Sequence, residues 1–174
     1  MDITGFFTDG YVLMNNPNVF RHLEEIVNDI YWVRSPEGML IPNRKTKQLK
    51  EALKSTHQLL AETYIKEIFP RYKTDYSSIW NGVDILATNW HCDYNTEKPN
   101  AMFLLYLNDM NEETGGAFGY RNAVTKEVTG FFYPKKYDVV FGSQQPSWEH
   151  KATKINNMAD RITANFGFII EGIQ

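Results

Sequence analysis

The sequence predicts a mainly β fold with flanking helices (α+β), and three observations carry that prediction. The first 75 residues contain two long stretches with apolar residues at helical spacing, 19–32 and 46–69. From about residue 79 onward, short β-like runs alternate with turn residues, a pattern typical of a sandwich or barrel. Strands and helices do not alternate along the chain, which argues against a Rossmann-type fold.

Each predicted helix has a recognisable boundary. Asn16 or Asn18 is the candidate cap of the first helix, whose apolar residues between 20 and 31 form one stripe. The second helix begins near Thr46 and ends before Pro70, because proline cannot continue a helix. The loop-type segment between the helices, 33–46, and the later loop 109–114 are expected to be lids over a pocket.

Seven runs with alternating or continuous apolar character are predicted to be strands. They comprise residues 83–90, 101–108, 115–122, 126–133, 137–143, 148–155 and 161–170. With 174 residues the chain is long enough to bury a core of its own, so we expect one domain over 1–174. Its mainly helical part, 1–75, is expected to support the strand-rich core at 76–174.

Composition and charge argue against several classes of protein. The formal net charge is -3, from 18 basic and 21 acidic residues, whereas a nucleic-acid-binding surface favours a basic excess. The single cysteine, Cys92, cannot form an intrachain disulfide, which fits a reducing compartment. We find neither a signal-peptide pattern nor an apolar run long enough for a membrane helix. We therefore expect a cytoplasmic protein that does not act in a membrane.

His91 and Asp93 lie two residues apart in the stretch WHCDY. In an extended strand, residues i and i+2 point to the same face, so these two side chains can bind one metal ion while Cys92 points away. His150 lies in a predicted strand that can pair beside this one. Two histidines and one carboxylate are typical ligands of non-haem iron(II), and they leave coordination positions open for a co-substrate and dioxygen.

The last predicted strand has one polar face. In 161–166, Arg161, Thr163 and Asn165 alternate with apolar residues and therefore share a face. A polar face on a central strand calls for a polar occupant, because unpaired polar groups are costly to bury. The guanidinium group of arginine matches a carboxylate through two parallel hydrogen bonds. Arg161 beside Thr163 is therefore a candidate carboxylate anchor.

These motifs occur along the chain in a fixed order: His91-x-Asp93, His150 and Arg161-x-Thr163. Two shorter motifs lie between them: Tyr106-Leu107-Asn108 and Gly115-Gly116-Ala117-Phe118. The first set resembles the motifs of iron(II)- and 2-oxoglutarate-dependent oxygenases, and the second resembles the prolyl 4-hydroxylase branch of that superfamily. The resemblance covers about residues 80–170 and implies a double-stranded β-helix, or jelly-roll, core.

The resemblance implies an enzyme that uses Fe(II), 2-oxoglutarate and O2. It assigns three metal ligands: His91, Asp93 and His150. It assigns three contacts to the distal carboxylate of 2-oxoglutarate: Arg161, Thr163 and Tyr106. The implied reaction is hydroxylation of an unactivated C–H bond with release of succinate and CO2. The carboxylate at position 93 favours hydroxylation, since related halogenases have a small residue there.

The substrate that the branch implies is a prolyl or other peptidyl residue. A free amino acid or small metabolite is the alternative, and a nucleobase ranks third. Five aromatic or basic residues beside the motifs are candidates for the substrate pocket: Trp90, Tyr94, Tyr120, Arg121 and Trp148. Arginine replaces the lysine of many prolyl 4-hydroxylases, and ILATNW before His91 lacks a tyrosine that some relatives use. Both departures leave the reaction type intact and bear on the substrate.

A competing class is a non-catalytic jelly-roll module that binds a metal or a small acid. Arg161 argues against it, because a structural metal site needs no carboxylate anchor. His22 and His57 lie on the predicted helices and are interpreted as structural or surface residues. Cys92 is interpreted as a packed or surface thiol, and Trp148 either lines the pocket or fills the barrel.

Overall fold

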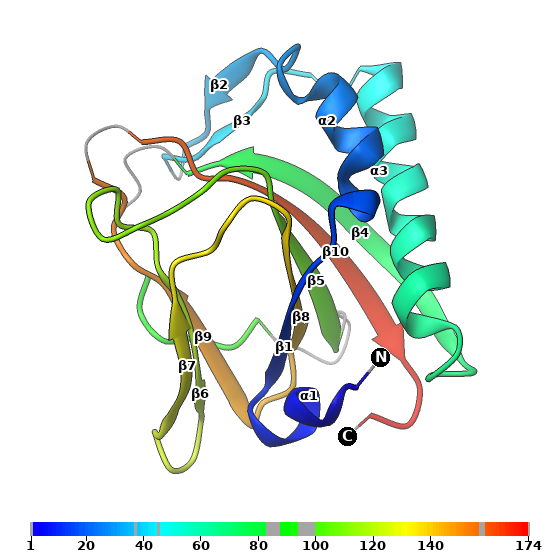
Figure 1. Ribbon diagram of the computed structural model, residues 1–174, viewed down its shortest axis with the longest axis vertical. Helices are drawn as coiled ribbons and strands as arrows, with labels where there is room; N and C mark the ends of the chain where they lie inside the picture. Colours follow the sequence, from blue (N-terminus) through cyan, green and yellow to red (C-terminus); the bar gives the residue numbers. More distant parts are fainter. Residues whose placement is uncertain are drawn as a thin grey trace.

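The computed structural model describes residues 2–36, 38–44, 46–82, 88–93, 100–156 and 159–173. Within these ranges the chain forms two facing β-sheets and a helical layer (Figure 1). The helical segments are α1 (Thr4–Thr8), η1 (Pro17–Phe20), α2 (Arg21–Val27), α3 (Lys47–Leu60) and η2 (Ala61–Ile65). The strands are β1 (Tyr11–Asn15), β2 (Trp32–Arg34), β3 (Leu40–Pro42), β4 (Tyr72–Asn81), β5 (Ala101–Tyr106), β6 (Phe118–Asn122), β7 (Val128–Phe132), β8 (Asp138–Ser143), β9 (Trp148–Ala152) and β10 (Ile162–Ile170).

The strands form a major sheet, β1-β8-β5-β10-β4-β3-β2, and a minor sheet, β7-β6-β9. All strand pairs are antiparallel. Residues 88–91 extend the minor sheet, since the amide of Thr88 donates to the carbonyl of Ala152 at 3.0 Å and His91 forms a β-bridge with His150. The expected fold class, mainly β with flanking helices around a jelly-roll core, is confirmed.

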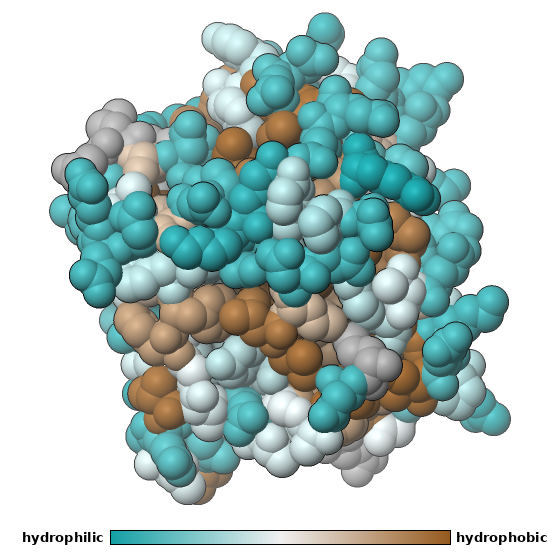
Figure 2. Space-filling model, viewed as in Figure 1, coloured by the Kyte–Doolittle hydropathy of each residue, from teal (hydrophilic) through white to brown (hydrophobic). Residues whose placement is uncertain are grey.

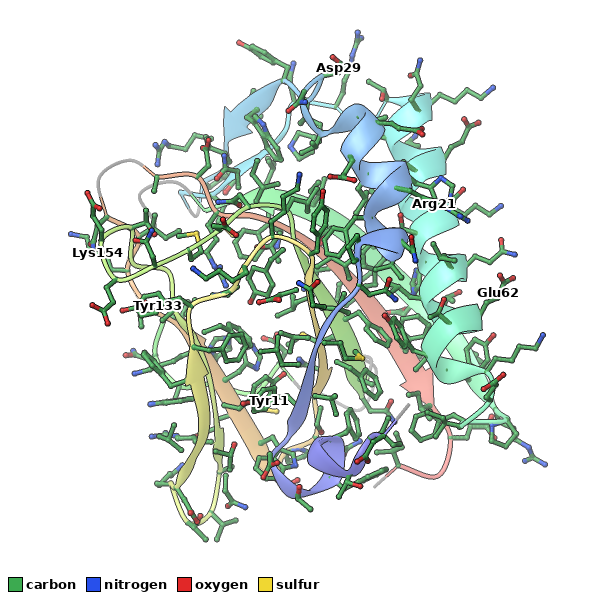
Figure 3. All side chains as sticks on the ribbon, in the orientation of Figure 1. Tyr11, Arg21, Asp29, Glu62, Tyr133 and Lys154 are labelled. Carbon is green, nitrogen blue, oxygen red and sulfur yellow. The ribbon has the colours of Figure 1, made fainter. Side chains whose placement is uncertain are left out.

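Strand alternation divides the interior into two apolar cores. Phe103 and Leu105 of β5 point to the helical layer, where α2 and α3 cover the outer face of the major sheet (Figure 1). Leu104 and Tyr106 of the same strand point into the space between the two sheets. That second core consists of Met102, Leu104, Tyr106, Phe118, Tyr120, Val140 and Trp148. Tyr11, which is labelled in Figure 3, packs against it. Its ring stacks on that of Tyr120 with the centroids 5.1 Å apart.

The first predicted helix is shorter than expected, and the second is close to its prediction. Asn16 accepts a hydrogen bond from the amide of Asn18 and starts η1, but α2 ends at Val27. The prediction of a helix to residue 32 was wrong, because α2 ends at Val27 and Trp32 is already the first residue of β2, which pairs with β3. The β2–β3 hairpin also occupies part of the predicted lid 33–46. Thr46 caps α3 by accepting from the amide of Leu49 at 3.2 Å.

Strands β1 to β4 were not predicted. β1 pairs with β8, and β4 pairs with β10 along most of its length, so the expected boundary near residue 75 cuts through β4. The sequence of β4, YKTDYSSIWN, carries few apolar residues and therefore a weak strand signal. The predicted strand 83–90 lies largely outside the described residues. Its residue Thr88 donates to Ala152 of the minor sheet, and the β-bridge of His91 with His150 follows directly after it.

In the part of the chain that the structure describes, none of the helices has the length and apolar character needed to span a bilayer. Hydrophilic side chains dominate the upper part of the face in Figure 2, and apolar side chains gather below them. Large exposed apolar residues in the described ranges include Phe7 on α1, Leu13 on β1, and Val128 and Phe131 on β7.

Candidate active site

His91, Asp93 and His150 meet at the edge of the minor sheet. The Nε2 atom of His91 lies 3.7 Å from Oδ1 of Asp93, and Nε2 of His150 lies 3.6 Å from Oδ2. One nitrogen or oxygen atom from each of the three side chains lies within 4.8 Å of the others. The backbones of the two histidines exchange hydrogen bonds of 3.1 and 2.8 Å, which fixes one ligand segment against the other.

Local hydrogen bonding prepares His91 to bind a metal through Nε2. Its Nδ1 atom lies 2.7 Å from the carbonyl oxygen of Asn89, so Nδ1 carries the proton and donates it to that oxygen. The lone pair then resides on Nε2, the atom that faces Asp93. A backbone acceptor of this kind is the usual means of orienting a metal-bound imidazole.

Burial keeps His150 in its neutral form. Loss of hydration lowers the pKa of His150 to about 4, although the charge of Asp93 opposes this shift. The neutral imidazole is the form that binds metals. The His150 side chain is only 9% exposed, whereas those of His91 and Asp93 are 41% and 52% exposed. The cluster therefore has a buried side at β9 and a side that is open to solvent.

The three side chains fit a divalent metal such as iron(II). Two neutral nitrogens and one carboxylate match the ligand preference of this ion. Nitrogen and oxygen ligands bound at about 2.1 Å to one ion lie no more than about 4.2 Å from each other. The observed atoms lie within 4.8 Å of one another, so small side-chain rotations suffice to bring all three to binding distance of one ion. These residues come from two segments of the chain, which are brought together by the β-bridge between His91 and His150 and by the hydrogen bond from Thr88 to Ala152.

Arg161 is a buried cation directly before β10. It is 3% exposed, and its Nη2 atom donates to the hydroxyl oxygen of Tyr106 at 3.3 Å. Its Nε atom has no hydrogen-bond partner. Among the described residues, no carboxylate forms an ion pair with it. The guanidinium carbon lies 5.3 Å from the ring centre of Trp80 and 6.0 Å from that of Phe118. A buried charge with unused donors calls for an anion.

Thr163 and Tyr106 offer further donors at the same place. Thr163 pairs with Tyr106 on β5 and with Trp80 on β4, so all three side chains share the face between the sheets. The Thr163 hydroxyl is buried and has no partner. Burial raises the pKa of Tyr106, against the opposing effect of Arg161, so the phenol stays protonated. Arg161, Thr163 and Tyr106 thus fit a carboxylate that enters this interior.

One ring separates the metal cluster from the anchor. The Phe118 ring centre lies 5.7 Å from that of His150 and 6.0 Å from the Arg161 guanidinium carbon. Gly115 and Gly116, just before β6, have φ of 70° and 72°, as expected for a turn that glycine favours. A side chain at 116 would clash with Met110 and lie 3.3 Å from the Arg161 side chain. The turn therefore leaves room for the stem of the anchor.

The candidate pocket residues divide between the two faces of the minor sheet. Tyr120 lies opposite His150 on the inner face, and its hydroxyl is buried without a partner. Trp148 shares that face and is buried. Trp90 and Arg121 lie on the outer face, where the Arg121 guanidinium carbon is 4.8 Å from the Trp90 ring centre. Tyr94 lies outside the described residues.

Two residues near the site were missed in the sequence. Tyr76 of β4 donates a hydrogen bond to Oδ1 of Asn165 at 3.4 Å. Loss of hydration and the nearby charge of Asp93 raise the pKa of Tyr76 to about 12, so this tyrosine stays neutral beside the cluster. Trp80 of the same strand lies over Arg161. The only signal for either was their spacing of four, which places both on one face of a strand.

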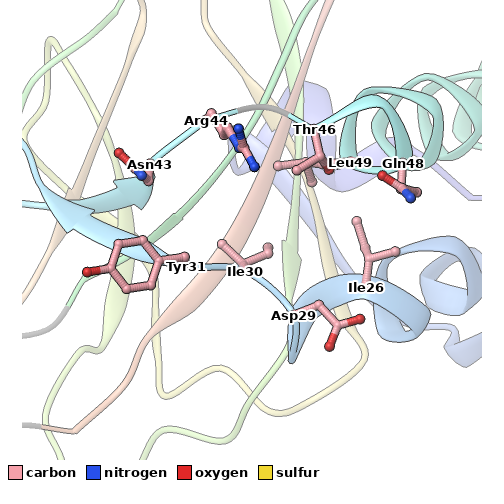
Figure 4. A pocket seen from close by; sticks show the side chains of 9 residues that line it. All are labelled: Ile26, Asp29, Ile30, Tyr31, Asn43, Arg44, Thr46, Gln48 and Leu49. Carbon is pink, nitrogen blue, oxygen red and sulfur yellow. Dashed lines mark hydrogen bonds between the residues drawn. The ribbon is translucent and has the colours of Figure 1, made fainter.

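Other predicted features contribute no side chain to the cluster. The Cys92 thiol donates to the carbonyl oxygen of Gln145 at 3.3 Å, consistent with a packed thiol. His57 is buried against the carbonyl of Gly167. A cavity of about 490 Å³ lies between the end of α2 and the start of α3 (Figure 4). The predicted lid 33–46 contributes Asn43, Arg44 and Thr46 to this cavity, and none of the cluster residues lines it.

Trp90 is expected to position His91. The ring centre of Trp90 lies 4.7 Å from the Lys151 ammonium and 4.8 Å from the Arg121 guanidinium carbon. The ring also packs against Gly119, where an added Cβ atom would lie only 3.1 Å from the Trp90 ring. Trp90→Ala should weaken Mn(II) binding about tenfold, the lower end of the effect of losing a partner of a metal ligand, because Trp90 acts on His91 through the backbone alone. Calorimetric titration measures this effect. Phe7→Ala, which removes an exposed aromatic on α1, should bind as wild type does. Equal affinity in the Trp90 variant would contradict the expectation.

Comparison with known proteins places the fold. No protein-family model matches this sequence, and no curated protein matches it. The structure is similar to a Trichoplax adhaerens prolyl hydroxylase solved with a hypoxia-inducible-factor peptide, with a TM-score of 0.68, 15% identity, and coverage of 96% of this chain and 86% of that one. It is also similar to a Burkholderia pseudomallei oxidoreductase of the 2OG-Fe(II) oxygenase family, with a TM-score of 0.71, 10% identity, and coverage of 95% and 88%.

A third similar structure is HygX from Streptomyces hygroscopicus with nickel, 2-oxoglutarate and hygromycin B bound. Its TM-score is 0.62 at 13% identity, with coverage of 97% of this chain and 86% of that one. Identities this low establish the fold alone. The chain has the fold of 2-oxoglutarate- and iron(II)-dependent oxygenases, prolyl hydroxylases among them, as the sequence motifs led us to expect.

Proposed function

We propose that residues 1–174 act as one Fe(II)- and 2-oxoglutarate-dependent oxygenase domain that hydroxylates an unactivated C–H bond. One observation carries the proposal. The buried side of the His91–Asp93–His150 cluster, at His150, and a buried arginine without a described carboxylate partner both lie beside the ring of Phe118 between the two sheets. A structural metal site explains the cluster but leaves the arginine unexplained. A dicarboxylate co-substrate explains both.

The residues of the chain have distinct roles in this proposal. His91, Asp93 and His150 would hold iron(II), which would activate dioxygen, the oxidant, for C–H cleavage with 2-oxoglutarate as the electron donor. Arg161, Thr163 and Tyr106 bind the distal carboxylate and so orient the co-substrate. Oxidative decarboxylation of the co-substrate yields succinate and CO2, and the substrate gains one oxygen atom.

The remaining side chains control protonation and water. The protein keeps His150 neutral by burial, and the Asn89 carbonyl keeps the proton of His91 on Nδ1. The rings of Phe118, Trp80 and Tyr106 surround the guanidinium and exclude water from it. In a site with little water, the pairing of Arg161 with a carboxylate is stronger than at the surface. The exposed side of His91 and Asp93 is where a primary substrate approaches.

The substrate we propose first is a prolyl or other peptidyl residue. The similarity to a prolyl hydroxylase with a bound peptide supports a peptide, and the similarity to a structure with hygromycin B supports a small molecule as the second candidate. The half-exposed side chains of His91 and Asp93 make the cluster accessible to a substrate from solvent.

Succinate formation tests the function. The purified protein, supplied with Fe(II), 2-oxoglutarate and air, should produce succinate above a metal-free control, and a proline-containing peptide mixture should stimulate it. Mass spectrometry should then find a peptide that has gained one oxygen atom. Stimulation by a pool of amino acids or metabolites instead would indicate the second substrate class. Binding of 2-oxoglutarate without succinate formation under any of these conditions would indicate a non-catalytic binding module.

A further inference from the structure

The backbone around Arg161 is held by two asparagine side chains from neighbouring strands. Oδ1 of Asn81, the last residue of β4, accepts from the amide of Arg161 at 3.0 Å. Oδ1 of Asn108, two residues beyond β5, accepts from the amide of Ile162 at 2.7 Å. The amide groups of both asparagines also donate to Asp160: Nδ2 of Asn81 to its carboxylate at 2.7 Å, and Nδ2 of Asn108 to its carbonyl at 2.5 Å.

We call this pair of asparagines, Asn81 and Asn108, the bracket. It lies where the regular strand pairing of β10 ends. β10 begins at Ile162, so Arg161 precedes the first residue of the ladder. Its carbonyl accepts from the amide of Gly82 at 3.0 Å, and its amide reaches only the Asn81 side chain. Strand ends fray unless such groups are tied down. Asn81 is itself buried, so its two hydrogen bonds are protected from competition by water.

The position of the guanidinium depends on this backbone. The group lies at the end of a long side chain, so a small rotation at the Arg161 backbone moves it by a large distance. Sites of this kind work when their groups are held within about 0.5 Å, and a shift of about 1 Å can cost roughly 100-fold in function. The surrounding rings and Gly116 limit where the Arg161 side chain can lie, but none of them fixes the position of the Arg161 backbone.

We propose that Asn81 and Asn108 are positioning residues for the co-substrate anchor. They fix the backbone of residues 160–162 and thereby hold Arg161 where a distal carboxylate docks. They touch neither the metal cluster nor the carboxylate. This gives Asn108, the last residue of the Tyr106-Leu107-Asn108 motif, a role of its own. The proposal rests on the function proposed above, because it presumes that Arg161 binds 2-oxoglutarate.

The chain offers a matched control at the opposite end of β10. Asn100 brackets Ile170 in the same manner, with Oδ1 accepting from its amide and Nδ2 donating to its carbonyl, both at 2.8 Å. Ile170 lies eight residues beyond Ile162, which is roughly 26 Å along a strand at about 3.3 Å per residue. Asn100→Ala therefore removes two equivalent hydrogen bonds from the same strand without touching the anchor.

The test is calorimetric binding of 2-oxoglutarate to the full chain preloaded with Ni(II), a metal that does not turn over. Asn81→Ala and Asn108→Ala should each raise the Kd for 2-oxoglutarate at least tenfold, while Asn100→Ala leaves it unchanged. All three should lower the melting temperature by similar amounts. Pyruvate, which lacks the distal carboxylate, should bind all variants equally. Should an Ala variant fail to fold, Asn108→Asp retains the acceptor for Ile162 and should show a smaller increase of the same kind.

A double-mutant cycle shows whether the asparagines act through Arg161. In an Arg161→Met background, Asn108→Ala should weaken 2-oxoglutarate no further. An equal loss in the Asn100 and Asn108 variants, or an unchanged Kd in both anchor variants, overturns the inference. Neither result touches the proposed function, provided that the Arg161 variant loses affinity. Wild-type protein that does not bind 2-oxoglutarate at all would instead overturn the proposed function.

Discussion

Replacing Asp93 with alanine is expected to abolish iron-dependent turnover and leave the fold intact. Asp93 supplies the only carboxylate of the cluster, and its two oxygens face the two histidines. Loss of a ligand should cost at least the roughly 100-fold in metal affinity that is typical of losing a supporting residue. Because its side chain is half exposed, the change should alter the free energy of unfolding by no more than about 0.5 kcal/mol. Fe(II) affinity, succinate yield and melting temperature are the measurements.

His150→Ala should have the same effect on metal binding, with a larger effect on stability because His150 is buried. His22→Ala is the control, since His22 lies on α2 and its ring accepts from Arg21 rather than facing the cluster. Metal affinity and turnover that survive in both the Asp93 and the His150 variants would refute the metal site. A loss in the His22 variant would point to general destabilisation.

Arg161→Met is expected to remove most of the affinity for 2-oxoglutarate and none of the affinity for metal. Breaking a buried charge pair costs about 3–5 kcal/mol, which corresponds to roughly 100- to 4,000-fold in Kd. The ligand-free protein should lose no stability, because methionine replaces a cation that has no described carboxylate partner. Both quantities come from calorimetry with Ni(II)-loaded protein and from thermal unfolding.

Arg71→Met serves as the control, because Arg71 is an exposed arginine paired with Glu171 at 3.5 Å. Its affinity for 2-oxoglutarate should equal that of wild type. If the Arg161 variant binds 2-oxoglutarate with wild-type affinity, Arg161 does not bind the distal carboxylate, and its buried charge has no explanation.

The proximity of His91 and Asp93 was predictable because a short local pattern encodes it, whereas His150 joins them through the long-range pairing of β9 with the segment that carries His91. The i, i+2 spacing of His91 and Asp93 places both on one side of an extended segment, even though that segment is a single bridge and not a regular strand. The same alternation put Arg161 and Thr163 on one face of the last strand. Such patterns need no knowledge of the partner strands.

Other parts of the site depend on which strands pair, and the local sequence pattern does not predict that pairing. Tyr76 and Trp80 face the interior because β4 pairs with β10, and β4 itself has a weak apolar pattern. Trp90 was expected beside the pocket, but as the neighbour of His91 it points to the opposite face, as alternation alone would have indicated. The bracket of Asn81 and Asn108 joins residues 27 apart in the chain, and only the sheet brings them to Arg161.

The central claim is that one interior binds both iron(II) and 2-oxoglutarate, and an anaerobic titration tests it most directly. Fe(II) is added to the metal-free protein, followed by 2-oxoglutarate, while the visible absorption spectrum is recorded. We expect a weak charge-transfer band that appears only after both are present, in wild type but not in Asp93→Ala. If no band forms in wild type and calorimetry detects no binding of 2-oxoglutarate, the jelly roll is not an oxygenase and the assignment of the site is wrong.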